Sequence, residues 1–125
     1  MKKNMQKIII LNETLPSWNK FYVGMHWAKR KEIVDYWHKL VWSNCKEQKI
    51  PKMKYNGRSV SVHTTCYFSS RKVQIKPTDI CDKLVVDELK NIVLEDNDWK
   101  HIKCTTTESQ VDKENPRTII TISYI

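Results

Sequence analysis

Hydrophobic positions along the chain follow two periods, and each period predicts a different kind of element. The β-branched run within residues 7–13 and the alternation of apolar and polar side chains over 59–68 both predict strands. Between them, apolar side chains recur every three to four residues over 26–48, which predicts an amphipathic helix that Pro51 ends. The positions on its main face are Ile33, Trp37, Leu40, Val41 and Asn44.

The second half of the chain repeats this succession of helix and strand. Residues 77–91 predict a helix with Thr78 or Asp79 as its N-cap. Residues 100–107 and 117–124 predict two further strands joined by a polar connection. The order is therefore β-α-β-α-β-β. It predicts an α/β (α+β) fold, in which two main helices pack on a small mixed β-sheet.

Length and composition favour one small intracellular domain. The 125 residues fit a single domain, 1–125, and a hydrophobic content of 40% is enough for one core. The apolar run from Ile8 to Leu11 is too short for a signal peptide or a membrane span, so we expect no membrane partner and a cytoplasmic location. The four cysteines contain no CxxC pair, which predicts free thiols in a reducing compartment.

The charge balance points to a polyanionic partner. The net charge is +8, from 22 Lys and Arg against 14 Asp and Glu, which favours nucleic acid before an anionic membrane. A basic protein with no such partner is the alternative. Aromatic rings interleave with cations over 18–31, where they could stack on splayed bases or instead belong to a core or a dimer interface. The candidate DNA-binding residues are Lys20, Lys29, Arg30, Lys31, Arg71 and Lys72.

Half of the carboxylates fall within residues 79–98 of this otherwise basic chain. On a helix, Asp79, Lys83 and Asp87 would share one face at four-residue steps, with Asp82 beside them. Carboxylates can hold Mg²⁺ for phosphodiester hydrolysis, and a neighbouring lysine can offset charge that develops on the phosphate. The alternative is structural: an N-cap at Asp79, a surface ion pair between Lys83 and Asp87, and a solvated acidic turn after the helix.

These features together resemble the RusA-type Holliday junction resolvases, a family common in phages and prophages. The likeness covers nearly the whole chain. The segment Pro16-Ser17-Trp18-Asn19-Lys20 is similar to the family's PPSxN motif after the first strand. Residues 79–97 are similar to the family pattern of an aspartate-rich DxDN start, a lysine, a DAL turn and a DD pair.

The resemblance implies a homodimer that cuts branched DNA, such as a four-way junction, symmetrically with Mg²⁺, for which Mn²⁺ could substitute. Lys83 matches the functional lysine, and Asp87 matches the aspartate of DAL. Asp96 matches the first aspartate of DD, with Asn97 or Asp98 at the second position. The implied activity is that of a structure-selective endodeoxyribonuclease in DNA recombination and repair, in a bacterium or a phage-infected cell.

The match departs from the pattern at the aspartate-rich start. Asp79 matches one of its aspartates, and Pro77 stands where the other would lie, which makes Asp82 the candidate replacement. The catalytic candidates are therefore Lys83, Asp79 and Asp87, and the metal candidates are Asp79, Asp82, Asp96 and Asp98. The departure motivates an alternative function, a catalytically impaired protein of the same fold that binds branched DNA without cutting it. A domain that binds RNA or protein without metal chemistry is a third hypothesis.

Overall fold

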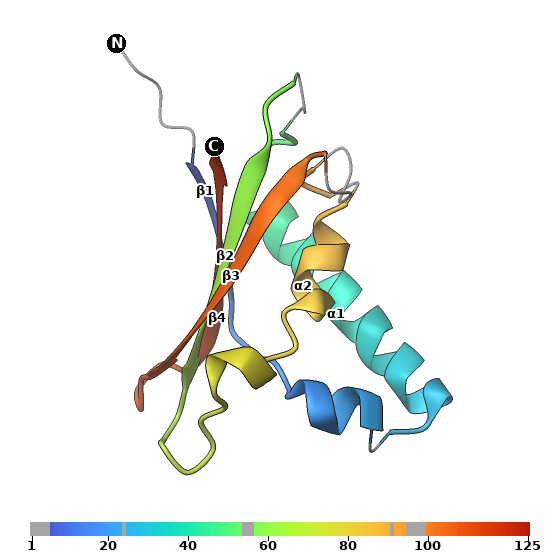
Figure 1. Ribbon diagram of the computed structural model, residues 1–125, viewed down its shortest axis with the longest axis vertical. Coiled ribbons are helices and arrows are strands. Elements are labelled where there is room, and N and C mark those ends of the chain that lie inside the picture. The colour runs from blue at the N-terminus through green and yellow to red at the C-terminus, as the bar shows by residue number, and fades with distance from the viewer. Residues whose placement is uncertain (1–5, 24, 54–56, 91, 95–99) are drawn as a thin grey trace.

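The computed structural model describes residues 6–23, 25–53, 57–90, 92–94 and 100–125. Four strands form one sheet: β1 (Gln6–Leu11), β2 (Val60–Phe68), β3 (Ile102–Val111) and β4 (Arg117–Tyr124). The helices are α1 (Trp27–Glu47) and α2 (Lys83–Val86), with three short helical turns named η1 (Asn19–Val23), η2 (Pro77–Asp79) and η3 (Asp87–Leu89). Figure 1 shows the sheet edge-on, with the helices beside it.

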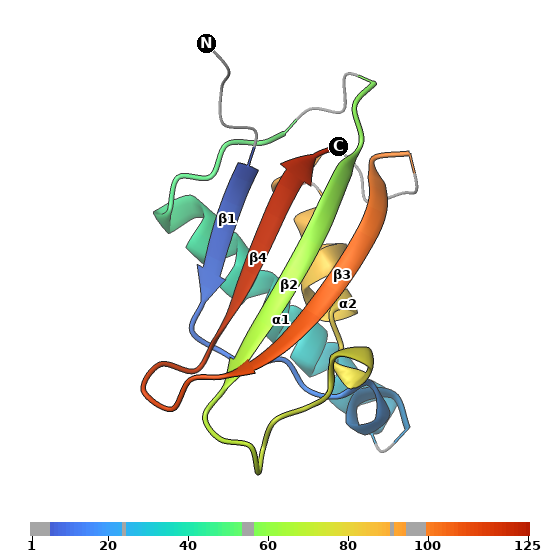
Figure 2. The ribbon, with the colours of Figure 1, turned by 60° about the vertical axis from the view of Figure 1, so that its left-hand side comes forward.

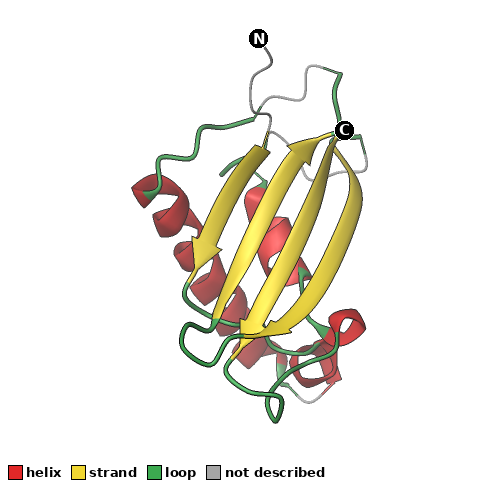
Figure 3. Cartoon of the chain, turned by 90° about the vertical axis from the view of Figure 1, so that its left-hand side faces the viewer, coloured by secondary structure: helices red, strands yellow, loops and turns green. Residues whose placement is uncertain are grey.

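The sheet has the order β1-β4-β2-β3. β2 and β3 run parallel, whereas β4 is antiparallel to both β1 and β2, so the sheet is mixed. The predicted class, a small mixed sheet with two helices, is confirmed. All helical segments lie on one side of the sheet, and the opposite face is open (Figures 2 and 3).

Alternation within the strands explains why only one face of the sheet is covered. In β2, five alternate side chains from Val60 to Phe68 are buried against the helices. In β4 the buried side chains are Thr118, Ile120 and Ile122. Because successive side chains point to opposite faces, the polar residues between them reach the open face. The predicted alternation of residues 59–68 is therefore confirmed.

Helix α1 packs on this core through the face that its apolar periodicity predicts. Trp37 and Val41 are buried, together with Cys45 one turn further on. The helix begins where the His26 Nδ1 accepts a hydrogen bond from the Ala28 N–H at 3.2 Å. It ends where Lys49 adopts a left-handed conformation with φ of 56°, just before Pro51.

The predicted continuous helix over 77–91 is wrong. The segment is divided into η2, α2 and η3, because Ile80 is extended and forms an antiparallel bridge with Ser17. The Cys81 N–H donates to the Pro16 carbonyl at 2.9 Å instead of continuing a helix from η2. This pairing joins the connection after β1 to the start of α2, and it gives both segments a fixed position.

Three of the four cysteines contribute to the core. Cys45, Cys66 and Cys81 are buried and Cys104 is exposed, and all four are free thiols, as predicted. Burial raises the pKa of Cys45 and Cys81 to about 11, because the apolar surroundings disfavour the thiolate. Among the described residues, no helix has the length and apolar character needed to cross a membrane.

Candidate functional site

The candidate site forms where η1 packs against the η2–η3 segment. Phe21 of η1 is buried in the core and holds Tyr22 edge-on, with ring centroids 4.8 Å apart. The Tyr22 ring in turn stacks on Trp18, with centroids 5.0 Å apart and an interplanar angle of 15°. The aromatic segment after β1 therefore supports one wall of the site.

Lys83 and Asp87 form the ion pair that their spacing predicts. The Lys83 Nζ lies 2.5 Å from the Asp87 Oδ2, and the two side chains are 51% and 41% exposed. The hydrogen bond from Lys83 to Asp87 raises the pKa of Lys83, so the ammonium is the stable form. Tyr22 and the pair line the same small cavity, of about 40 Å³. Asp87 therefore holds the Lys83 ammonium in place beside the Tyr22 ring.

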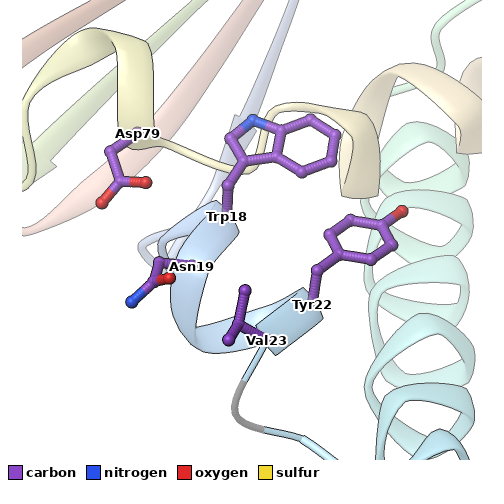
Figure 4. A pocket seen from close by; sticks show the side chains of 5 residues that line it. All are labelled: Trp18, Asn19, Tyr22, Val23 and Asp79. Atoms are coloured by element: carbon purple, nitrogen blue, oxygen red, sulfur yellow. The ribbon is translucent and has the colours of Figure 1, made fainter.

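Asp79 does not lie on a common helix with this pair. It ends η2, and the extended Ile80 separates it from α2. The predicted helical face of Asp79, Lys83 and Asp87 is therefore wrong at its first member. The N-cap interpretation is also wrong, because η2 is preceded by Lys76 and α2 by Asp82. Asp79 is half-buried and lines an open hollow beside η1 (Figure 4).

Asp82 has different surroundings from Asp79. Its Oδ2 accepts a hydrogen bond from the Thr107 hydroxyl on β3, at 3.4 Å. Desolvation raises the pKa of Asp82, against the lowering effect of the Thr107 hydroxyl. The two aspartates that precede Lys83 in the sequence therefore face different elements: Asp79 faces η1, and Asp82 faces the sheet.

The donor set allows a hard cation. Within the ranges that the structure describes, no three His, Cys, Asp or Glu side chains gather into a potential metal site. Mg²⁺ commonly takes only one or two protein carboxylates and completes its shell with water and phosphate oxygens. Asp79 and Asp82 fit that requirement in number and chemistry. The other two metal candidates, Asp96 and Asp98, lie outside the described residues.

The candidate DNA-binding cations come from three segments at one end of the molecule. Figures 1 and 2 show η1, the start of α1 and the turn over 69–76 at the lower end, beside η2. The cations are Lys20 on η1, Lys29, Arg30 and Lys31 on α1, and Arg71 and Lys72 in the turn. Five of the six are exposed, and Arg30 is half-buried with its guanidinium 5.6 Å from the Tyr22 ring centroid.

The core interpretation of the aromatic segment is confirmed for Phe21, and stacking on bases stays a prediction for the exposed rings. Phe21 is a core residue, whereas Trp27 is 65% exposed and Tyr22 is 38% exposed. Asn19 and Tyr22 belong to the aromatic segment that the sequence indicated, but neither was among the predicted site residues. Sequence reasoning also missed Thr107, which gave no signal because only the parallel register of β2 and β3 brings it to Asp82.

No protein-family model matches this chain, and no curated protein matches it. Any functional assignment therefore rests on the geometry of these residues and on the resemblance in motif.

Proposed function

We propose that the chain is a Mg²⁺-dependent, structure-selective endodeoxyribonuclease of the RusA type, which cuts Holliday junctions or other branched DNA. The observation that supports this most is Lys83, held at 2.5 Å by Asp87 and preceded in the sequence by two aspartates. A net charge of +8 supplies the attraction to DNA.

Each residue has a distinct role in this proposal. Lys83 contacts the scissile phosphate and offsets the charge that develops on it. Asp87 is a positioning residue, because its contact with the Lys83 Nζ fixes the direction of the ammonium. Asp79, Asp82, Asp96 and Asp98 would hold the ion. When bound, Mg²⁺ lowers the pKa of a coordinated water and polarises the phosphate.

The cations on η1, on the first turn of α1 and on the turn over 69–76 follow the DNA backbone. Such contacts position a duplex without reading its sequence. A four-way junction has two strands to cut, and a symmetric homodimer would supply two sites. We therefore include a homodimer in the proposal, with a bacterial or phage-infected cell as its setting.

The test is cleavage of a labelled four-way junction with Mg²⁺. The native chain is expected to make paired, symmetric nicks. Lys83→Ala and Asp79→Asn are each expected to slow cleavage by about 100-fold or more, because removing one preorganised electrostatic group from an active site has an effect of that order. Lys46→Ala is the matched control, since it removes one exposed lysine from the last turn of α1 and should cleave at the native rate.

Two outcomes would contradict the nuclease assignment. Junctions left intact by the native chain with both Mg²⁺ and Mn²⁺ would exclude it. Native cleavage rates in both site variants would place the chemistry elsewhere. Tight junction binding without nicks would select the second candidate, a catalytically impaired binding protein, which Pro77 at a motif aspartate position already favours.

A further inference from the structure

A solvent-open hollow of about 420 Å³ lies beside the candidate cleavage site. It is lined by Trp18, Asn19, Tyr22, Val23 and Asp79 (Figure 4). The stacked rings of Trp18 and Tyr22 come from η1 and the residue before it, and Asp79 ends η2. The Ser17–Ile80 bridge fixes these two segments to each other, so the hollow has a defined shape.

The lining combines apolar rings with hydrogen-bonding groups. In Figure 4, Asp79 and Asn19 lie on one side of the hollow and the Tyr22 ring on the other. Tyr22 is 38% exposed and Val23 is 77% exposed, so apolar surface is left uncovered here. A planar ligand with polar edges would cover the rings and bond to the amide and the carboxylate. A nucleobase has that shape and chemistry, and stacking on aromatic side chains is how proteins hold unpaired bases.

Tyr22 connects the hollow to the candidate cleavage site. Its ring lines the hollow and also the small cavity that contains Lys83 and Asp87. The Arg30 guanidinium lies 5.6 Å from the centre of the same ring. A nucleotide whose phosphate contacts Lys83 therefore has a stacking surface and a second cation beside it, within the same small region.

We infer that this hollow binds one unstacked base, that of the DNA nucleotide next to the scissile phosphate. The inference rests on the proposed function, because Lys83 defines where that phosphate lies. The Asp79 carboxylate presents only acceptor oxygens, which favours bases with an exocyclic amino group (adenine, cytosine or guanine) over thymine, whereas the Asn19 carboxamide can both donate and accept. The site would also create selectivity for branched DNA, because extracting a base from an intact duplex is costly, whereas an unpaired base at a branch is available.

Binding without metal tests this inference separately from cleavage. The probe is a forked duplex that carries one unpaired nucleotide at the branch. Binding of the protein to this probe is measured by fluorescence anisotropy in EDTA. The native chain is expected to bind the fork with adenine, cytosine or guanine about 10-fold more tightly than the fork with an abasic nucleotide, because base–aromatic stacking has an effect of that order or greater. Thymine should lie between them.

Four variants separate stacking from general affinity. Trp18→Ala should abolish the preference over the abasic fork and leave affinity for intact duplex unchanged, whereas Trp18→Phe should retain the preference. Asn19→Ala, at an exposed position, should weaken binding of every base-bearing fork and leave binding of the abasic fork unchanged, because the carboxamide can donate to or accept from any base. Trp42→Ala is the matched control, because Trp42 is 50% exposed on α1, where Lys46 covers its ring.

The inference is overturned if the native chain binds abasic and base-bearing forks equally. It is also overturned if Trp18→Ala weakens fork and duplex binding to the same extent, or if this variant loses self-association, which would mean that a second copy covers the hollow. If Trp18→Ala fails to fold, the abasic probe together with Trp18→Phe and Asn19→Ala still tests whether the hollow binds a base. A chain that discriminates the base without cutting DNA would contradict only the proposed nuclease, and a nuclease indifferent to the base would contradict only this inference.

Discussion

The two aspartates before Lys83 differ in their surroundings although only two residues separate them. Asp79 lines an open hollow, whereas Asp82 accepts a hydrogen bond from Thr107 and is half-buried against the sheet. Burial raises the pKa of Asp82 because it disfavours the carboxylate more than the Thr107 hydroxyl favours it. A bound cation would reverse that cost, which is one reason to consider Asp82 a metal ligand.

Replacing Asp82 by Asn should stabilise the metal-free protein increasingly as the pH rises. The folded-state pKa of Asp82 is raised above its ordinary value of 3.8. The stability contributed by the neutral form is therefore complete below that value and is lost as the pH rises through the folded-state pKa. Because Asn remains neutral, Asp82→Asn should gain free energy of unfolding relative to the native chain between about pH 4 and about pH 7.

Urea unfolding in EDTA at both pH values would measure this difference. Asp35→Asn is the matched control, because it removes the same charge from a side chain that is 58% exposed and paired with the surface Lys31. A stability difference for Asp82→Asn that stays constant with pH, or that falls as the pH rises, would contradict the burial argument.

At the scale of elements, the last turn of α1 protects the outer edge of the sheet. β1 is an edge strand, and the Gln48 carboxamide forms two hydrogen bonds with the main chain of Ile10. It donates to the Ile10 carbonyl at 3.0 Å and accepts from the Ile10 N–H at 3.3 Å. Exposed strand edges promote pairing with other chains, so this side chain occupies part of a surface that could otherwise add a strand.

Removing the Gln48 carboxamide from the edge of β1 should destabilise the protein and promote its self-association. Gln48→Ala loses two hydrogen bonds to the β1 backbone, which should lower the free energy of unfolding by about 1 kcal/mol. The freed edge carries Ile8 and Ile10, which are 47% and 42% exposed. Chemical denaturation and sedimentation velocity would test both effects, with the exposed neighbour Glu47→Ala as control. Equal stability and equal association in the two variants would show that the Gln48 contacts contribute nothing measurable.

At the scale of the whole molecule, charge is distributed so that several basic segments lie at one end. The turn over 69–76, η1 and the start of α1 meet there, beside η2 (Figures 1 and 2). The turn is separated along the chain from η1 and the start of α1 by most of α1 and the whole of β2. In the proposed complex, we expect this cationic end to contact the DNA backbone.

Salt dependence should reveal those contacts. The logarithm of the DNA association constant falls with the logarithm of salt concentration, with a slope of about −0.9 for each neutralised phosphate. The double variant Arg71→Ala/Lys72→Ala should therefore reduce the slope by roughly 1 to 2, and Lys29→Ala by up to about 0.9. Lys46→Ala, on the last turn of α1, should leave the slope unchanged. Unchanged slopes in all three variants would place the DNA on another surface.

Sequence periodicity determined most of the elements and the composition of the core. The strand over 59–68 and the helix over 26–48 were predicted to within about one residue, because each has an apolar face and a clear end signal. The pairing of Lys83 with Asp87 was also predictable, because both residues lie within a turn of helix and the contact is local.

The tertiary structure decided the features that depend on contacts between distant segments. Residues 77–91 have the composition of a helix, but the hydrogen bond from Cys81 to Pro16 outweighs that tendency and moves Asp79 away from Lys83 and into the hollow. The parallel register of β2 and β3 brings Thr107 to Asp82. Local propensity acts over a few residues, whereas these pairings join segments separated by about 25 to about 65 residues, and only the folded chain brings them together.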